Sequence, residues 1–163
     1  MTEPTDADAG DAVDRLLDEA QALENLEGAM PLYQRALALD PDRAATHYNL
    51  GLVHKYRGAW AESLHHNRRA SDLLPGDQAP AWNMGIAATA LRDWPAARDA
   101  WRRAGIAIAA GAGPVDEDFG LAPVRLNPDG SAEVVWGRRI DPARVVLGNI
   151  PYPASGFRSG DVV

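Results

Sequence analysis

The chain has 163 residues, with 23 acidic against 16 basic side chains and no cysteine. This length suits one domain, or a short repeat array with a small appended unit, and the net negative charge removes the non-specific attraction to phosphate backbones. We therefore expect no nucleic-acid partner, and the lack of cysteine excludes disulfides, thiolate zinc sites and a cysteine nucleophile.

Residues 1–9 are polar and acidic, and they bury too little apolar surface to repay the entropy of ordering. We predict a flexible acidic tail there. The segment lacks the basic region and the apolar stretch of a secretory signal, and no apolar run in the chain reaches the ~18 residues of a membrane helix. We therefore expect a cytoplasmic protein without a membrane partner. Arginine outnumbers lysine 15 to 1, which, with the abundant alanine, indicates a GC-rich bacterial genome.

Residues 10–111 are rich in alanine and leucine at helical spacing, interrupted by proline, glycine and aspartate. The same residue types recur in this segment at intervals of 34 positions. The recurring sets are Leu16/Leu50/Met84, Leu26/Trp60/Trp94, Ala29/Ser63/Ala97, Arg35/Arg69/Arg103, Ala36/Ala70/Ala104, Pro41/Pro75, Asn49/Asn83 and Gly51/Gly85. So many sets in one register predict three repeats, over residues 10–43, 44–77 and 78–111, each of two helices joined by a short turn.

The three units resemble tetratricopeptide repeats. The segments that carry the resemblance are "LLDEAQALENLEGAMPLYQRALALDP", "NLGLVHKYRGAWAESLHHNRRASDLLP" and "WNMGIAATALRDWPAARDAWRRA". Together they cover about residues 10–109, and their small-residue, aromatic and proline positions agree with one another. The resemblance implies a mainly α fold, in which about six helices form a right-handed helix-turn-helix superhelix with a concave groove.

Residues 112–163 change character, because Val, Leu and Arg now alternate around turn signals. The Asp129-Gly130 pair between two β-prone runs predicts a hairpin, so we expect a small C-terminal β-rich unit. The third repeat has Ala109 where the family has its stop proline, and no polar capping helix follows it. Terminal repeats need their outer apolar face covered, so we predict that the β-unit, from near Leu121, packs on the third repeat as its cap.

The last residues, "GDVV", have the composition of a strand. Three alternatives follow from the unpaired edge that such a strand would leave. The strand pairs with the earlier run "ARVVL", or the chain is truncated relative to a natural product, or the edge pairs with a second copy to form a homo-oligomer.

The middle repeat has a polar interior. His47 and His54 occupy positions where the family usually has Trp and Tyr, and Asn67 stands where an aromatic ring is usual. One interpretation is that these side chains and Ser63 satisfy one another by hydrogen bonds, since an unsatisfied buried polar group costs ~1–3 kcal/mol. A second interpretation adds the neighbouring His65 and His66 and makes a metal site, but no acidic ligand stands at coordinating spacing, and we expect no metal. A third interpretation is a pH switch, because neutral buried histidines must charge on acidification.

The resemblance also implies a binding groove lined by the first helix of each repeat, which would hold an extended peptide or a helix of a partner protein. The groove positions are Asp11, Asp14 and Asp18 in the first repeat, Tyr48, Asn49, Leu52, Lys55 and Tyr56 in the second, and Trp82, Asn83, Ile86 and Thr89 in the third. The groove is acidic at one end and aromatic at the other, so we expect a ligand with apolar residues next to Lys or Arg. Alternatively, Tyr48 and Trp82 pack between repeats or under the β-unit. A carboxylate-clamp function is disfavoured, because only Asn49 matches that subclass.

Signals for catalysis are weak. "GAGPVDED" lacks the Lys, Ser or Thr that would complete a phosphate-binding loop, and no histidine follows Ser155 or Ser159. We therefore predict a non-catalytic protein-protein interaction module, an adapter or scaffold, with no cofactor. The alternative is that the β-unit is a small-ligand or catalytic domain, with a pocket around Trp136, Arg138 and Arg139, and that the repeats only target it.

Overall fold

The computed structural model describes residues 6–23 and 25–163. The chain divides into two compact units, residues 1–110 and residues 111–163. Every helix in the described part of the chain is too short or too polar to cross a lipid bilayer.

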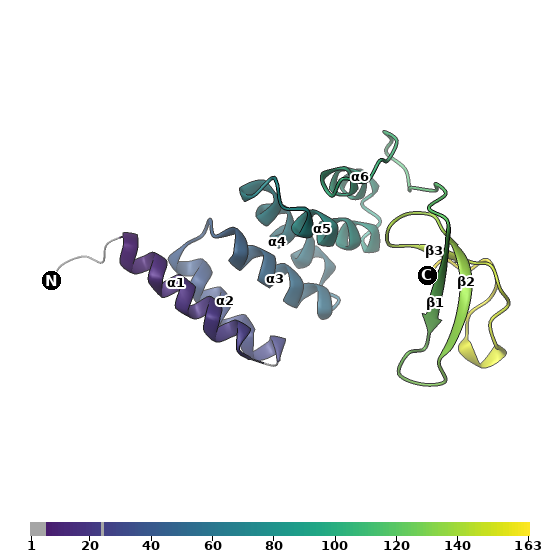
Figure 1. Cartoon of the computed structure of the whole chain (residues 1–163), viewed down its shortest axis with the longest axis horizontal. Helices are drawn as coiled ribbons and strands as arrows, with labels where there is room; N and C mark the ends of the chain where they lie inside the picture. Colours follow the sequence, from purple (N-terminus) through teal and green to yellow (C-terminus); the bar gives the residue numbers. More distant parts are fainter. Residues whose placement is uncertain (1–5, 24) are drawn as a thin grey trace. The chain divides into compact units, whose positions relative to one another are not determined.

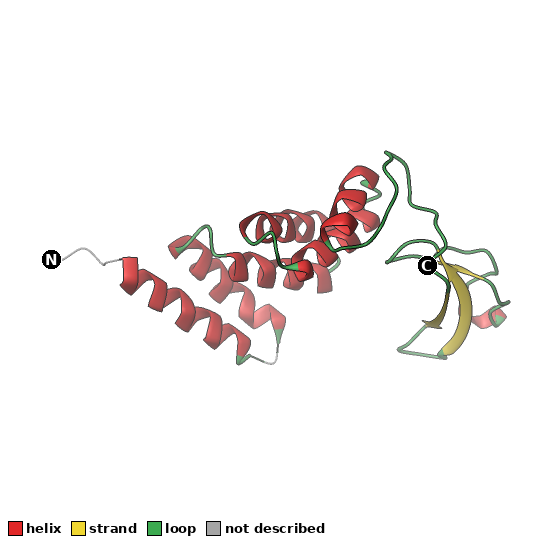
Figure 2. Ribbon diagram, turned by 45° about the horizontal axis from the view of Figure 1, so that its top comes forward, coloured by secondary structure: helices red, strands yellow, loops and turns green. Residues whose placement is uncertain are grey.

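The described part of the first unit consists of six helices, which follow one another as antiparallel neighbours (Figures 1 and 2). Their bounds are α1 (Asp6–Gln21), α2 (Leu26–Leu39), α3 (Ala44–Tyr56), α4 (Trp60–Leu73), α5 (Gln78–Ala90) and α6 (Trp94–Arg103). The prediction of a mainly α unit of about six helices is confirmed. Residues 6–9, assigned to the acidic tail from sequence, form the first turn of α1, and residues 1–5 lie outside the described residues.

Side-chain caps mark where several helices begin. The side chain of Asn25 accepts a hydrogen bond from the Gly28 amide at 2.7 Å and caps α2. Asp77 and Asp93 cap α5 and α6 in the same way. Each cap satisfies an amide that has no partner within its own helix, so these polar residues divide the alanine-rich sequence into helices of defined length.

Two glycines let paired helices approach closely. A Cβ atom at Gly51 on α3 would lie 2.4 Å from the Asn67 amide on α4, and one at Gly85 on α5 would lie 2.6 Å from the Trp101 ring on α6. Asn67 and Trp101 are themselves 34 residues apart, in the position that Tyr33 occupies in the first repeat. In the second and third repeats the 34-residue period thus has a packing cause, because a buried side chain on the second helix lies directly on the first helix at its glycine. The equivalent position of the first repeat is Leu17.

The second unit is a three-stranded antiparallel sheet in the order β1-β2-β3. Its strands are β1 (Leu121–Leu126), β2 (Glu133–Arg139) and β3 (Val145–Leu147). Asp129 and Gly130 lie in the turn between β1 and β2, so the predicted hairpin is confirmed. One face of the sheet is buried, with Leu126, Val135 and Leu147 packed against Phe157 and Val163.

The segment "GDVV" pairs with β3. Val162 bridges Val146, and Val145 and Val163 exchange backbone hydrogen bonds of 2.8 and 3.0 Å. The first of the three alternatives for this segment, pairing with "ARVVL", is therefore confirmed. The edge of this segment that faces β3 is already paired within the chain. Homo-oligomerisation through the C-terminal segment stays a prediction.

A buried ion pair stabilises the second unit. Asp141 is 1% exposed, and its carboxylate accepts from the Arg144 guanidinium at 2.6 Å and from the backbone amides of Ala143 and Arg144. Arg144 also donates to the Val115 carbonyl oxygen at 2.6 Å. These contacts fasten the segment before the sheet to the turn between β2 and β3, which assigns Asp141 a structural role.

Candidate functional site

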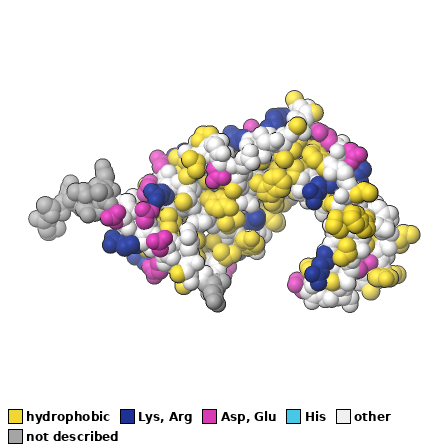
Figure 3. All heavy atoms as spheres, viewed as in Figure 1, with side chains coloured by type: hydrophobic (Ala, Val, Ile, Leu, Met, Phe, Trp, Pro, Cys, Tyr) yellow, Lys and Arg dark blue, Asp and Glu magenta, His cyan; other side chains and the backbone are white. Residues whose placement is uncertain are grey.

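The residues predicted to line the groove lie on α1, α3 and α5, the first helix of each pair. Most are accessible. Those exposed are Asp11, Asp14, Asp18, Tyr56 and Trp82, and those half-buried are Tyr48, Asn49, Leu52, Lys55 and Ile86. Figure 3 shows apolar side chains on the face over α3 and α5. We refer to Tyr48, Leu52, Tyr56, Trp82 and Ile86 as the first-helix surface.

Asn83 and Thr89 differ from the prediction because both are buried, Asn83 with only 5% of its surface exposed. The Asn83 side-chain oxygen accepts a hydrogen bond from Lys55 Nζ at 2.9 Å. The same ammonium group lies 5.1 Å from the centroid of the Tyr56 ring. Lys55 therefore joins α3 to α5 and lies beside the exposed Tyr56 ring. The buried Asn83 side chain holds the Lys55 ammonium group at the first-helix surface.

The acidic end of the predicted groove is partly neutralised. Asp14 on α1 forms an ion pair with Arg43, the residue that precedes α3. Asp11 and Asp18 have no ion-pair partner in the described part of the chain. The pair joins α1 to the residue that precedes α3, while the two remaining carboxylates stay exposed to solvent.

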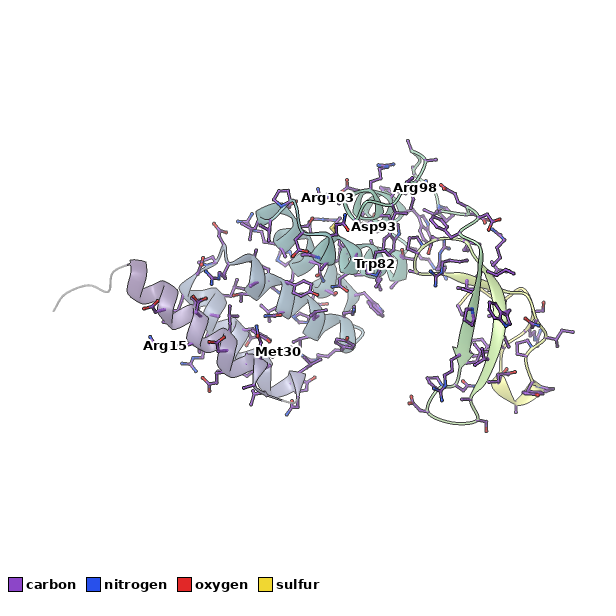
Figure 4. The ribbon with its side chains drawn as sticks, viewed as in Figure 1. Arg15, Met30, Trp82, Asp93, Arg98 and Arg103 are labelled. Carbon is purple, nitrogen blue, oxygen red and sulfur yellow. The ribbon has the colours of Figure 1, made fainter. Side chains whose placement is uncertain are left out.

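Trp82 is both exposed and packed. Its side chain, labelled in Figure 4, extends from α5, is 40% exposed and meets the ring of Trp101 on α6 edge-on, with centroids 5.3 Å apart. Trp101 itself is fully buried. The contact fixes one face of Trp82 within its own repeat and leaves the remainder of the ring free to meet a partner.

A hollow of about 160 Å³ opens beside Tyr48. It lies between the start of α3, the end of α4 and the start of α5. Its lining residues are Ala44, Ala45, Tyr48, Ala70, Leu74, Asp77 and Pro80. All but Asp77 are apolar or aromatic, so the hollow suits an apolar side chain of a ligand. The carboxylate of Asp77 lies at the same hollow.

Comparison with known families agrees with this architecture. Residues 21–58, which include α2 and α3, match the family model described as TPR repeat. The match and the six helices fit a tetratricopeptide-like repeat protein. Repeats of this family generally mediate protein-protein interactions and are typically non-catalytic. No curated protein matches the chain.

The polar interior of the middle tetratricopeptide-like repeat contains two separate networks. In the first, Ser63 donates to the Gly51 carbonyl oxygen at 2.9 Å, and the Asn67 amide donates to the Ser63 carbonyl oxygen at 2.9 Å. In the second, His47 contacts His66 and the carbonyl of residue 41, so the expectation that the histidines pair with Ser63 and Asn67 is wrong. The repeat positions of His47 and Asn67 did not identify His66 as the partner of His47, because His47 and His66 are 19 residues apart in the sequence.

The three residues predicted to line a pocket in this unit, Trp136, Arg138 and Arg139, do not share one face of the sheet. Trp136 and Arg138 lie on the exposed face of β2, and strand alternation directs Arg139 to the opposite face. The two hollows described in this unit lie around Ile150 instead, with volumes of about 410 and 430 Å³. Neither is lined by the three predicted residues.

Proposed function

We propose that this protein is a non-catalytic interaction module that binds an extended peptide or a helix of a partner protein along the first-helix surface. The observation that carries the proposal is the hollow beside Tyr48, with exposed Tyr56 and Trp82 on the same set of helices. Large aromatic side chains that are already held by neighbours make effective anchors, because they lose little conformational entropy on binding.

The proposed ligand carries an apolar side chain next to Lys or Arg. The apolar lining of the hollow favours the apolar side chain. Asp77 at the hollow favours the Lys or Arg, as do Asp11 and Asp18, which have no ion-pair partner among the described residues. The Asp77 carboxylate makes only one described hydrogen bond, from the Ala79 amide. A carboxylate of this kind retains acceptor capacity for a cationic side chain of the ligand.

A displayed library of random peptides tests the proposal at pH 7.5. Selections compare the natural chain with Tyr48→Ser/Tyr56→Ser, a double variant on the first-helix surface. Arg68→Ala is the matched control, because Arg68 is exposed on α4, a second helix, and has no described partner. Circular dichroism establishes that all three proteins are folded. Trp82 is left intact, because its contact with Trp101 would confound binding with stability.

The expected result is enrichment of peptides with an apolar residue beside Lys or Arg by the natural chain and by Arg68→Ala. The folded double variant should lose this enrichment by at least tenfold, which corresponds to about 1.4 kcal/mol of binding free energy. Equal enrichment by the double variant would remove the first-helix surface as the binding site. No enrichment by any protein would contradict a peptide-binding function.

A second candidate places a small-ligand function in the sheet unit. The hollow of about 410 Å³ is lined by Ile150, Pro151, Pro153, Gly156, Phe157, Arg158 and Ser159. Arg158 has no ion-pair partner among the residues that the structure describes, so its guanidinium is available to a small apolar anion. A thermal-shift screen of aromatic and aliphatic carboxylates tests this candidate. A stabilising ligand whose effect is lost in Arg158→Ala would support it, and a screen without one would count against it.

A further inference from the structure

The four histidines of the chain form one cluster in the middle repeat. His66 on α4 lies at its centre. The centroid of its ring is 5.3 Å from that of His47, 5.5 Å from that of His54 and 5.1 Å from that of His65. The rings of His54 and His66 are stacked, with only 5° between their planes. The cluster therefore connects α3, which carries His47 and His54, to α4.

Hydrogen bonding assigns the protons in the neutral cluster. His47 Nε2 is 2.9 Å from the carbonyl oxygen of Pro41, which can only accept, so Nε2 carries a hydrogen. His47 Nδ1 lies 3.0 Å from His66 Nδ1. With both rings neutral, His47 Nδ1 is the acceptor and His66 Nδ1 is the donor. A first added proton that binds His66 Nε2 leaves the hydrogen between the two Nδ1 atoms in place. A second proton, on His47 Nδ1, makes both Nδ1 atoms donors and breaks the bond.

Few counter-charges face the cluster. Glu62 on α4 is the one acid that acts on His54 and His66, and Arg57 at the end of α3 adds positive charge near His54. In the turn between α2 and α3, Asp42 is paired with Arg69 and Arg43 with Asp14. From α2, Glu27 is paired with Arg57. The helix α5, which packs on the other side of α4, contains no Asp, Glu, Lys, Arg, His or Tyr. Added protons would therefore be poorly compensated.

We propose that the four-histidine cluster is an acid-sensitive latch, which holds α3 against α4 when neutral and loosens this contact when it takes up protons. Because α3 also presents Tyr48, Leu52 and Tyr56, loosening it would release a bound partner as the pH falls. This regulatory consequence rests on the proposed function of the first-helix surface. The latch itself does not, because it concerns only the packing of two helices within one repeat.

The titration of the cluster agrees with this geometry. Burial, followed by the charges of His47, His65 and His54, lowers the pKa of His66 to about 4, against the opposing effect of Glu62. Burial also lowers the pKa of His54, with Glu62 opposing and Arg57 adding to the effect. Both folded-state values lie below 6.5, so the unfolded chain binds protons first on acidification. The stabilisation is complete above about pH 6.5 and is lost progressively as the pH falls toward 4.

Two measurements on the full chain test the latch without any partner. The first is a proton NMR titration of the histidine ring hydrogens from pH 7.5 to 4.5. The second is the melting temperature over the same range for the natural chain, His66→Gln and the control Arg68→Gln. Arg68 is the matched control because it is exposed on the same helix, lies outside the histidine cluster and has no described side-chain partner.

We expect the His66 resonance to remain untitrated at pH 5.5. The natural chain and Arg68→Gln should lose roughly 5–10 °C of melting temperature between pH 6.5 and 4.5, and His66→Gln should lose less than half as much. If all four resonances titrated with midpoints between pH 6 and 7, the latch would be overturned whether or not His66→Gln folds. Parallel melting curves for the three proteins would overturn it equally. The peptide selection at pH 7.5 is unaffected, because His54 and His66 are neutral there.

Discussion

The ring of Trp101 lies so close to Gly85 that a single methyl group at Gly85 would come within 2.6 Å of it. We predict that Gly85→Ala lowers the free energy of unfolding by about 2 kcal/mol, because either the ring or helix α5 must move in a fully buried contact. Urea denaturation measures the change. Gly76→Ala is the control, because a Cβ there meets nothing within 4 Å. An equal effect in both variants would contradict the packing argument.

Arg92 is in the left-handed backbone region at the position that Gly58 occupies 34 residues earlier, with φ of 58° and 69° respectively. A side chain costs about 1 kcal/mol in this region, so Arg92→Gly should raise the free energy of unfolding by about 0.5–1 kcal/mol. Arg92→Ala is the decisive control, because it removes the guanidinium but keeps the Cβ. Thermal denaturation should show a gain only for glycine, and a similar gain for alanine would assign the effect to the side chain.

Lys55 and Asn83 should be energetically coupled. Their hydrogen bond of 2.9 Å joins α3 to α5 and involves a charged donor and a buried acceptor. In a double-mutant cycle of Lys55→Met and Asn83→Ala, we expect an interaction energy of about 1 kcal/mol in chemical denaturation. Additive effects would mean that the ammonium group is equally well solvated without Asn83.

The Asp141 carboxylate should be essential to the sheet unit. Asp141→Ala leaves the Arg144 guanidinium and two backbone amides without their acceptor in a buried site, so we expect a loss of about 3 kcal/mol. Amide NMR signals of residues 115–147, followed through urea denaturation, report this loss directly. Asp129→Ala, at an exposed turn residue, should leave the transition unchanged. A sheet unit that tolerates both substitutions equally would show that the ion pair contributes little.

The positions of the helices could be predicted from local features of the chain. Pro41 and Pro75 stand just after α2 and α4, and Asp77 and Asp93 cap the helices that follow them, so these boundaries depend on neighbouring residues alone. The start of α1 is where this argument failed. Composition placed residues 6–9 in a tail, whereas these residues continue the first helix toward the N-terminus.

The candidate surface could be predicted only in part. Tyr56 and Trp82 are exposed as their repeat positions implied, but the burial of Asn83 depends on how α3 packs against α5. The contact of His66 could not be predicted from the sequence either. Its ring faces His47 because α4 folds back on α3, and the helical pattern of α4 alone does not identify that partner.

By itself, the sequence determined the repeat architecture. A glycine stands where the helices of the second and third repeats approach, a proline follows α2 and α4, and both residue types recur at an interval of 34 positions. Only the tertiary structure decided which polar groups meet in the interior, which groove residues remain accessible, and that the segment "GDVV" pairs with β3. Those outcomes depend on contacts between residues distant in the chain. Their geometry follows from packing all the elements at once, whereas a local pattern reports only the needs of its own segment.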